Sequence, residues 1–240
     1  RYGLQRDDAV AEACDATFVV GDGLRHGDGP SREGWQEHVT EWFQSAPATW
    51  DADAVRLQTT QTPVTVADIE RAYDVSPTKS QVPEGGRTAA VEKLNAFTES
   101  IGSYPGSISA PQDAREGTSQ LSPYLRFGCL SVREVYQHVT EHAPDCRGRE
   151  MFISRLYWNR HYSQKLVDWP GWMDTAVNPV MEEFHADTHD PDLVAAWKRG
   201  ETGYPMVDAS MRCLRGTGWL NFRMRAMSAS VFCDLLQQPW

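Results

Sequence analysis

The chain has 240 residues, of which 40% are hydrophobic and 23% are charged, and its formal net charge is -10. This composition is ordinary for a globular protein, and the charge argues against nucleic-acid binding over the whole surface while leaving room for a local basic groove. No apolar run approaches the ~20 residues that a membrane-spanning helix needs, and the charged opening RYGLQRDDAV predicts no signal peptide.

The use of cysteine and lysine indicates the kind of cellular compartment in which the protein works. The five cysteines are scattered without a C-x-x-C pair, which predicts reduced thiols in a cytoplasmic protein rather than disulfides or a zinc site, and no other metal site is expected. Lysine occurs only at positions 79, 93, 165 and 198, so most basic residues are arginine. A lysine-poor acidic surface slightly favours a protein adapted to a salt-rich cytoplasm over an ordinary acidic protein, because added Asp and Glu help solubility more than added Lys does.

Residues 1–46 are predicted to be the end of an α/β domain. A charged helix is expected over residues 6–15, with Val10 and Ala13 facing inward, followed by a buried strand over residues 16–20. Ser31 is a candidate cap for a second helix that runs through Gln44. Its amphipathic pattern predicts a buried face made of Trp35, Val39, Trp42 and Phe43.

Residues 47–87 are predicted to form a connector between domains, because they are rich in Pro, Thr, Asp and Gln and contain one short helix over residues 66–73. From residue 88 nearly every segment is helical. Helices are expected over residues 89–101, 131–142, 147–167 and 191–200, with a turn or short helix over 119–127. Ser131 and Glu134 form a capping box. We therefore predict an all-α bundle over residues 88–240.

The stretch from Thr202 to Leu236 is predicted to be two helices joined at Gly216-Thr217-Gly218, with Gly216 as the C-cap. Helical spacing places Val207, Met211 and Leu214 on one face of the first helix. The apolar stripe predicted for the second helix consists of Leu220, Met224, Met227, Val231 and Leu235.

Four arginines crowd around this turn, at positions 212, 215, 223 and 225. Guanidinium groups suit phosphates, carboxylates and flat rings, so the cluster is a candidate anion site. The alternative is a set of surface arginines that pair with Asp208 or Asp234 or are solvated. Arg223 and Arg225 are two residues apart and therefore point to different sides of their helix.

Two further groups of residues could bind a ligand. The run from Gly117 to Pro123 offers three hydroxyls before a proline-started helix, an arrangement that binds phosphate, although simple helix capping is the commoner explanation. Trp158 lies beside Asn159 and Arg160 on the long helix and could stack on a base or a flavin-like ring. Tyr162, on the same helix, is expected to belong to its packing. Hydrolase motifs such as H-E-x-x-H, G-x-S-x-G and a Walker loop are absent from the sequence.

Three segments resemble one known family: GTSQLSPYLRFGCLS, FISRLYW and TGYPMVDASMRCLRGTGWLNFRMRAM. They are similar to the FAD-binding helical domain of the DNA photolyase/cryptochrome family, over residues 88–240. Residues 1–46 are similar to the end of its N-terminal α/β, Rossmann-like antenna domain. The resemblance implies a mainly α fold, a helical-bundle flavin-binding domain preceded by the tail of an α/β domain, within a longer protein.

The resemblance also implies residue roles. The loop with Thr118, Ser119, Leu121 and Ser122 would cradle the FAD diphosphate, with Gln120 in place of the usual arginine. Trp158 would stack on a flipped pyrimidine dimer, Arg223 and Arg160 would face DNA, and Trp240 would pass an electron to the flavin. The remaining cofactor-binding residues implied are Tyr104, Asn159, Trp219, Phe222 and Arg225.

The implied function is light-driven electron transfer from reduced FAD to a pyrimidine dimer flipped out of duplex DNA, a carbon–carbon lyase reaction. The alternatives are a cryptochrome-type photoreceptor without repair activity, and a scaffold or DNA-binding module with a degraded flavin site. Four departures argue against the lesion chemistry while flavin binding is still expected: Arg155 replaces a carboxylate, Asn159 an arginine, Phe222 an asparagine and Ala226 a methionine. Because the sequence ends before the family's acidic flavin loop, we expect the 240-residue chain alone to bind FAD weakly or not at all.

Overall fold

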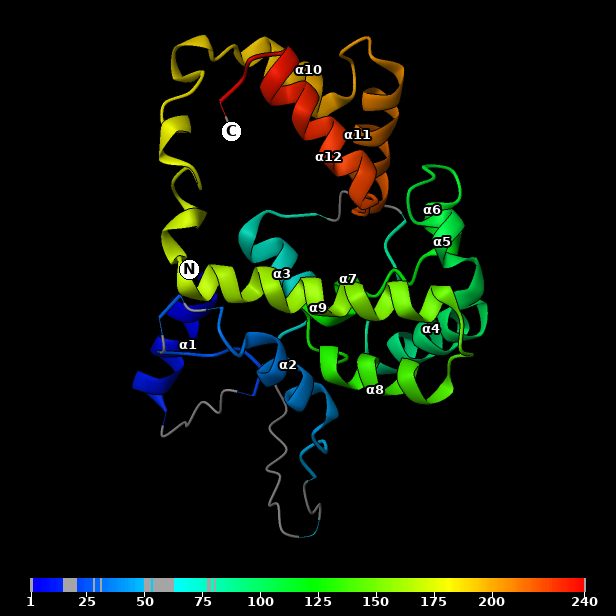
Figure 1. The fold of residues 1–240 in the computed structure, drawn as a ribbon. Coiled ribbons are helices and arrows are strands. Elements are labelled where there is room, and N and C mark those ends of the chain that lie inside the picture. Colours follow the sequence, from blue (N-terminus) through cyan, green and yellow to red (C-terminus); the bar gives the residue numbers. More distant parts are fainter. Residues whose placement is uncertain are drawn as a thin grey trace.

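Helix α9 (Arg147–Asp168) is the longest element of the computed structural model and crosses the middle of the molecule in Figure 1. The structure describes residues 2–14, 21–27, 29–30, 32–49, 53, 63–76, 79 and 81–239. All regular structure in these residues is helical, as predicted. The predicted strand at residues 16–20, the predicted cap Ser31 and Trp240 lie outside the described residues.

The main core brings together four helices: α2 (Trp35–Gln44), α4 (Arg87–Ser100), α8 (Val132–His142) and α9. Phe43 from α2 stacks on Tyr136 from α8 at 4.4 Å between ring centroids, and Phe97 from α4 meets Phe152 from α9 at 4.7 Å. Helix α2 thus shares a core with the bundle. The predicted domain boundary at residue 46 stays a prediction.

The start of α9 packs directly on the end of α4. Gly148 lies where a Cβ atom would overlap the carbonyl oxygen of Ile101, so this crossing needs a glycine. Short helices follow α4 in chain order, and they lead the chain back along α9. They are η1 (Ile101–Ser103), α5 (Tyr104–Ser107), α6 (Ala114–Gly117) and α7 (Ser122–Arg126).

The predicted capping box of α8 is confirmed. The Ser131 hydroxyl accepts from the Glu134 N–H, and the Glu134 carboxylate accepts from the Ser131 N–H. Arg87 at the start of α4 adds two hydrogen bonds to the same carboxylate, which lowers the pKa of Glu134. The predicted connector helix is also confirmed as α3 (Val66–Tyr73), capped by Thr65.

The last part of the chain forms a separate helical unit, drawn in orange and red in Figure 1. Three helices, α10 (Pro191–Arg199), α11 (Pro205–Thr217) and α12 (Phe222–Ser230), pack in sequence order, and a π-helical turn, η5 (Val231–Leu235), ends the unit. Its small core contains Val207, Met211 and Val231. Three single turns connect α9 to α10: η2 (Pro170–Met173), η3 (Pro179–Met181) and η4 (Ala186–Thr188).

The structure corrects four details. The C-cap of α11 is Gly218 rather than Gly216, because Gly218 is the glycine that adopts the left-handed conformation, with its N–H bonded to the Leu214 carbonyl. Leu235 is 61% exposed, since the wider π-helical turn rotates it off the apolar stripe. Val10 and Ala13 are exposed on α1 (Tyr2–Ala13). Helix α2 begins only at Trp35, after Gly34.

Candidate ligand cavity

A cavity of about 740 Å³ lies between α9, the loop that follows α6 and the start of α12. Helix α9 supplies one wall, with Arg155, Trp158, Asn159, Tyr162 and Ser163 at helical spacing. Tyr162 is 53% exposed, so its expected place in the helix packing is wrong. A volume of this size is within the range of cofactor-binding pockets.

The second wall is the loop with Thr118, Ser119 and Gln120. The Thr118 hydroxyl donates to the carbonyl of Ala114 at 2.6 Å, and the Ser119 hydroxyl accepts from the Leu121 N–H at 3.4 Å. Gln120 has a φ of 50° and donates its side-chain amide to the carbonyl of Arg115, so its end is turned back toward α6. The helix that follows is α7, a single turn of five residues. Hydroxyls, rather than a long helix dipole, are therefore what this loop offers to a ligand.

The third wall is the turn between α11 and α12. Asn221 caps α12 by accepting from the Met224 N–H at 3.1 Å. Its other amide atom, Nδ2, is buried and has no hydrogen-bond partner among the described residues. Since a buried donor without a partner costs about 1–3 kcal/mol, this atom indicates a missing acceptor at the cavity wall. Arg225 is held next to it by a 2.7 Å hydrogen bond from Nε to the carbonyl of Leu220.

The cavity is electropositive. Arg155, Arg223 and Arg225 line it, and the lining residues that the structure describes include no carboxylate, although the chain carries a net charge of -10. Burial raises the pKa of Tyr104, an effect that the nearby Arg155 guanidinium opposes, so the phenol stays protonated and can donate. The cavity therefore suits a large, anionic ligand that is rich in hydrogen-bond acceptors.

All the residues predicted to bind a cofactor line this one cavity: Tyr104, Thr118, Ser119, Gln120, Leu121, Ser122, Asn159, Trp219, Phe222 and Arg225. Two of the residues predicted to face DNA, Trp158 and Arg223, line it as well. Phe222 is 78% exposed and so lies at the rim. Whether these residues bind a ligand stays a prediction.

Three of the predicted arginines lie elsewhere. Arg160 is not among the lining residues and donates from Nη1 to the carbonyl of Asp22 at 2.7 Å. Arg212 donates to the carbonyl of Gly200 at 2.6 Å, and Arg215 to that of Arg199 at 3.1 Å. Arg212 and Arg215 therefore satisfy the last carbonyls of α10, so they serve the fold rather than the cavity.

Sequence reasoning missed Ile108, Ser109, Ser163 and Leu166, which also line the cavity. Ser163 and Leu166 could have been found, because each lies four residues after a cavity residue on α9. Ile108 and Ser109 carry no such signal, since they follow the four-residue helix α5.

The described residues contain no group of three or more His, Cys, Asp or Glu side chains arranged to hold a metal ion. Among them, no helix combines the length and apolar character of a membrane span. All five cysteines are free thiols.

Residues 152–240 match a family model described as the FAD binding domain of DNA photolyase, which names the expected cofactor. The chain is 32% identical to the deoxyribodipyrimidine photo-lyase of Halobacterium salinarum over an alignment of 267 residues, which covers 98% of this chain and 53% of that protein. It is 34% identical to the deoxyribodipyrimidine photo-lyase of Alkalihalophilus pseudofirmus over 156 residues, 65% of this chain and 32% of that protein. The chain thus spans about half, or less, of the length of these relatives.

Solved structures have the same fold. A class III photolyase from Agrobacterium tumefaciens matches with a TM-score of 0.56 and 29% identity, over 65% of this chain and 32% of that chain. A cryptochrome from Synechocystis sp. PCC6803 matches with a TM-score of 0.56 and 23% identity, over 78% of this chain and 39% of that chain. These matches confirm the predicted helical fold class.

Proposed function

Because this chain belongs to the DNA photolyase/cryptochrome family, we propose that its cavity holds FAD and that the protein uses light to split pyrimidine dimers in DNA. The curated relatives named above carry the name deoxyribodipyrimidine photo-lyase. When bound, reduced FAD would supply the light-excited electron that breaks the dimer's carbon–carbon bonds.

The cavity chemistry carries the flavin part of this proposal. Three arginines without a lining carboxylate fit a diphosphate and the acceptor atoms of an isoalloxazine ring. The unpartnered Asn221 Nδ2 offers a buried donor for one of those acceptors. The hydroxyls of Thr118, Ser119 and Ser122 would hold the diphosphate, and Trp219 and Arg225 would lie beside the rings.

The DNA part of the proposal rests on the cavity rim. Trp158 is 48% exposed and lines the cavity, so its ring is available to stack on a base that leaves the duplex. Arg223 is exposed at the same rim and would pair with a phosphate. We propose duplex DNA with a flipped dimer as the substrate and, since all five cysteines are free, a reducing cytoplasm as its setting.

A flavin photoreceptor without repair activity is the second candidate, and Arg155 is the observation that favours it. Arg155 lines the cavity next to Trp158, at the position where the family resemblance implies a carboxylate. A guanidinium has only donors, so it cannot accept the N–H of a pyrimidine base. The third candidate is a scaffold with a degraded flavin site, and Gln120 is the observation that favours it. The Gln120 side chain bonds the Arg115 carbonyl, so its amide is not free to bind a phosphate.

Two measurements on the full-length protein separate these candidates. Purified protein is examined for flavin absorbance and then illuminated with DNA that contains pyrimidine dimers. Flavin absorbance with light-dependent loss of dimers supports the photolyase proposal. Flavin absorbance without loss of dimers supports the photoreceptor, and colourless protein that does not take up FAD contradicts both flavin proposals.

A further inference from the structure

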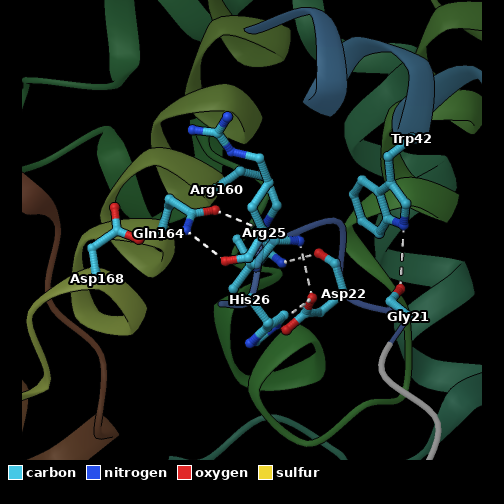
Figure 2. Close-up of polar contacts among 9 residues, drawn as sticks. Gly21, Asp22, Arg25, His26, Trp42, Arg160, Gln164 and Asp168 are labelled. Carbon is cyan, nitrogen blue, oxygen red and sulfur yellow. Dashed lines mark hydrogen bonds and ion pairs between the residues drawn. The ribbon is translucent and has the colours of Figure 1, made fainter. Parts of the chain in front are cut away.

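Two neighbouring residues of α9 connect the cavity to the N-terminal segment 21–26. Asn159 lines the cavity, whereas Arg160 lies against the segment (Figure 2). Arg160 donates from Nη1 to the Asp22 carbonyl at 2.7 Å, and from Nε and Nη2 to Asn159 Oδ1 at 3.1 and 2.6 Å. One guanidinium therefore joins a backbone carbonyl of the segment to the amide of a cavity residue.

A second contact fixes the same segment one helical turn further along α9. Gln164 is 1% exposed, and its amide exchanges two hydrogen bonds of 2.9 Å with the backbone N–H and carbonyl of Arg25, as Figure 2 shows. Asp168 accepts a further bond from Gln164 Nε2 at 2.8 Å. This contact holds the segment without touching any cavity residue.

The bonds from Arg160 determine which end of the Asn159 amide faces the ligand. An arginine side chain has donors and no acceptor, so the amide oxygen of Asn159 must be the atom that faces it. The structure gives Nδ2 of Asn159 no hydrogen-bond partner among the described residues. The amide is thus held by its oxygen, and its two N–H donors remain for a ligand.

We infer that Arg160 is a positioning residue: it holds Asn159 so that the amide N–H groups donate to an acceptor oxygen of the ligand in the cavity. Such an oxygen belongs to a phosphate or a carbonyl group. This inference rests on the proposed function only for the source of that oxygen, which is FAD or the DNA lesion. It assigns Arg160 a task inside the protein in place of a direct contact with DNA.

The restraint on Asn159 is measured first in the ligand-free protein, so that this test stands apart from the proposed function. The variant Arg160→Met keeps an apolar stem and loses every donor. In Arg160→Met the Asn159 side chain should sample several rotamers, so we expect its side-chain amide resonances in NMR spectra to move to rotamer-averaged chemical shifts. They should keep their positions in Gln164→Met, which breaks the neighbouring contacts to Arg25 and Asp168 but none of the bonds of Arg160. Unchanged Asn159 resonances in Arg160→Met overturn the inference.

The donor role is measured by titrating the full-length protein with FAD and, separately, with an oligonucleotide that carries a thymine dimer. Loss of one hydrogen bond predicts binding weakened about 3- to 10-fold for one of these ligands, in Arg160→Met and equally in Asn159→Leu. The double variant should bind no more weakly than either single variant, because both remove the same bond. The ligand that responds identifies the source of the acceptor oxygen.

Two results of the titration contradict a positioning role. If the two substitutions weaken binding additively, or if Gln164→Met weakens it as much as Arg160→Met does, Arg160 only supports the fold. A wild-type protein that binds neither ligand contradicts the proposed function instead, and the Asn159 resonances still decide the inference about Arg160.

Discussion

The guanidinium of Arg155 lies over the ring of Trp158, with 5.5 Å between its central carbon and the ring centroid. A cation over an exposed aromatic ring contributes about 0.5–1 kcal/mol, and it also covers a face on which a base could stack. This pair therefore sets how well the cavity rim can receive a flipped pyrimidine.

Replacing Arg155 by glutamate should favour the damaged base. The substitution uncovers Trp158 and supplies an acceptor for a base N–H, so we expect the affinity for a dimer-containing oligonucleotide, relative to its undamaged counterpart, to rise about 5-fold or more. Fluorescence anisotropy measures both affinities. Arg147→Glu makes the same change of charge at the start of α9, outside the cavity, and should leave the ratio unchanged. An unchanged ratio in Arg155→Glu would sink the idea that this rim receives the lesion.

The close packing of Gly23 against Trp42 predicts a large loss of stability for Gly23→Ala. Gly23 has a φ of 72°, and an added Cβ atom would overlap the Trp42 ring. Strain and overpacking together should lower the free energy of unfolding by about 2–4 kcal/mol, measured by urea denaturation. Gly21→Ala is the matched control, because a Cβ atom there meets nothing within 4 Å. Equal stability of the two variants would show that the segment does not dock on Trp42 as described.

The Glu134 carboxylate predicts a pH-dependent part of the stability. Hydrogen bonds from Arg87 are the largest cause of its lowered pKa, so the ionised form is the one that the fold prefers. Its stabilisation is fully present above the ordinary pKa of 4.5 and is lost as the pH falls through the lower, folded-state value. Glu134→Gln should therefore lower the free energy of unfolding at pH 7. We expect a loss of only about 1 kcal/mol, because solvent screens the partly exposed ion pair with Arg87.

At pH 3 the difference between wild type and Glu134→Gln should shrink, which urea denaturation at both pH values measures. Glu92→Gln, on the exposed face of α4, should change little at either pH. A difference that stays the same at pH 3 and pH 7 would argue that the charge of Glu134 adds nothing to its cap.

Local signals predicted the elements well where a cap marked their ends. Helix α10 begins after its N-cap Asp190 and ends at its C-cap Gly200, and the capping box of Ser131 and Glu134 starts α8. Each of these residues forms hydrogen bonds with backbone groups that the helix end leaves unpaired. The predicted C-cap of α11 was wrong because Gly216 and Gly218 have the same intrinsic preference for the left-handed conformation, and the sequence does not distinguish between them.

Contacts between residues that are distant in the chain could not be predicted from the sequence. Gln164 is buried and bonds the backbone of Arg25, 139 residues earlier, and any residue type other than proline at position 25 would offer the same groups. Asn159 and Arg160 are adjacent in sequence, but Asn159 lines the cavity whereas Arg160 bonds the segment 21–26. The sequence does not show where that segment lies, so it could not separate the two roles. The residues predicted to bind the cofactor line one cavity, and they could be named together because the family resemblance, unlike periodicity, carries information on distant contacts.

Asn221 leaves a buried amide donor without an acceptor at the cavity wall, and FAD titration of the full-length variant Asn221→Ser measures whether the flavin supplies that acceptor. Serine keeps the cap of α12 but lacks the amide donor, so the contribution of the cap to stability should stay within about 0.5 kcal/mol of wild type. The FAD dissociation constant should rise about 3- to 10-fold. Asn178→Ser, at another cap that does not line the cavity, should leave it unchanged. If Asn221→Ser binds FAD as tightly as wild type does, the flavin does not lie against Asn221 in this cavity.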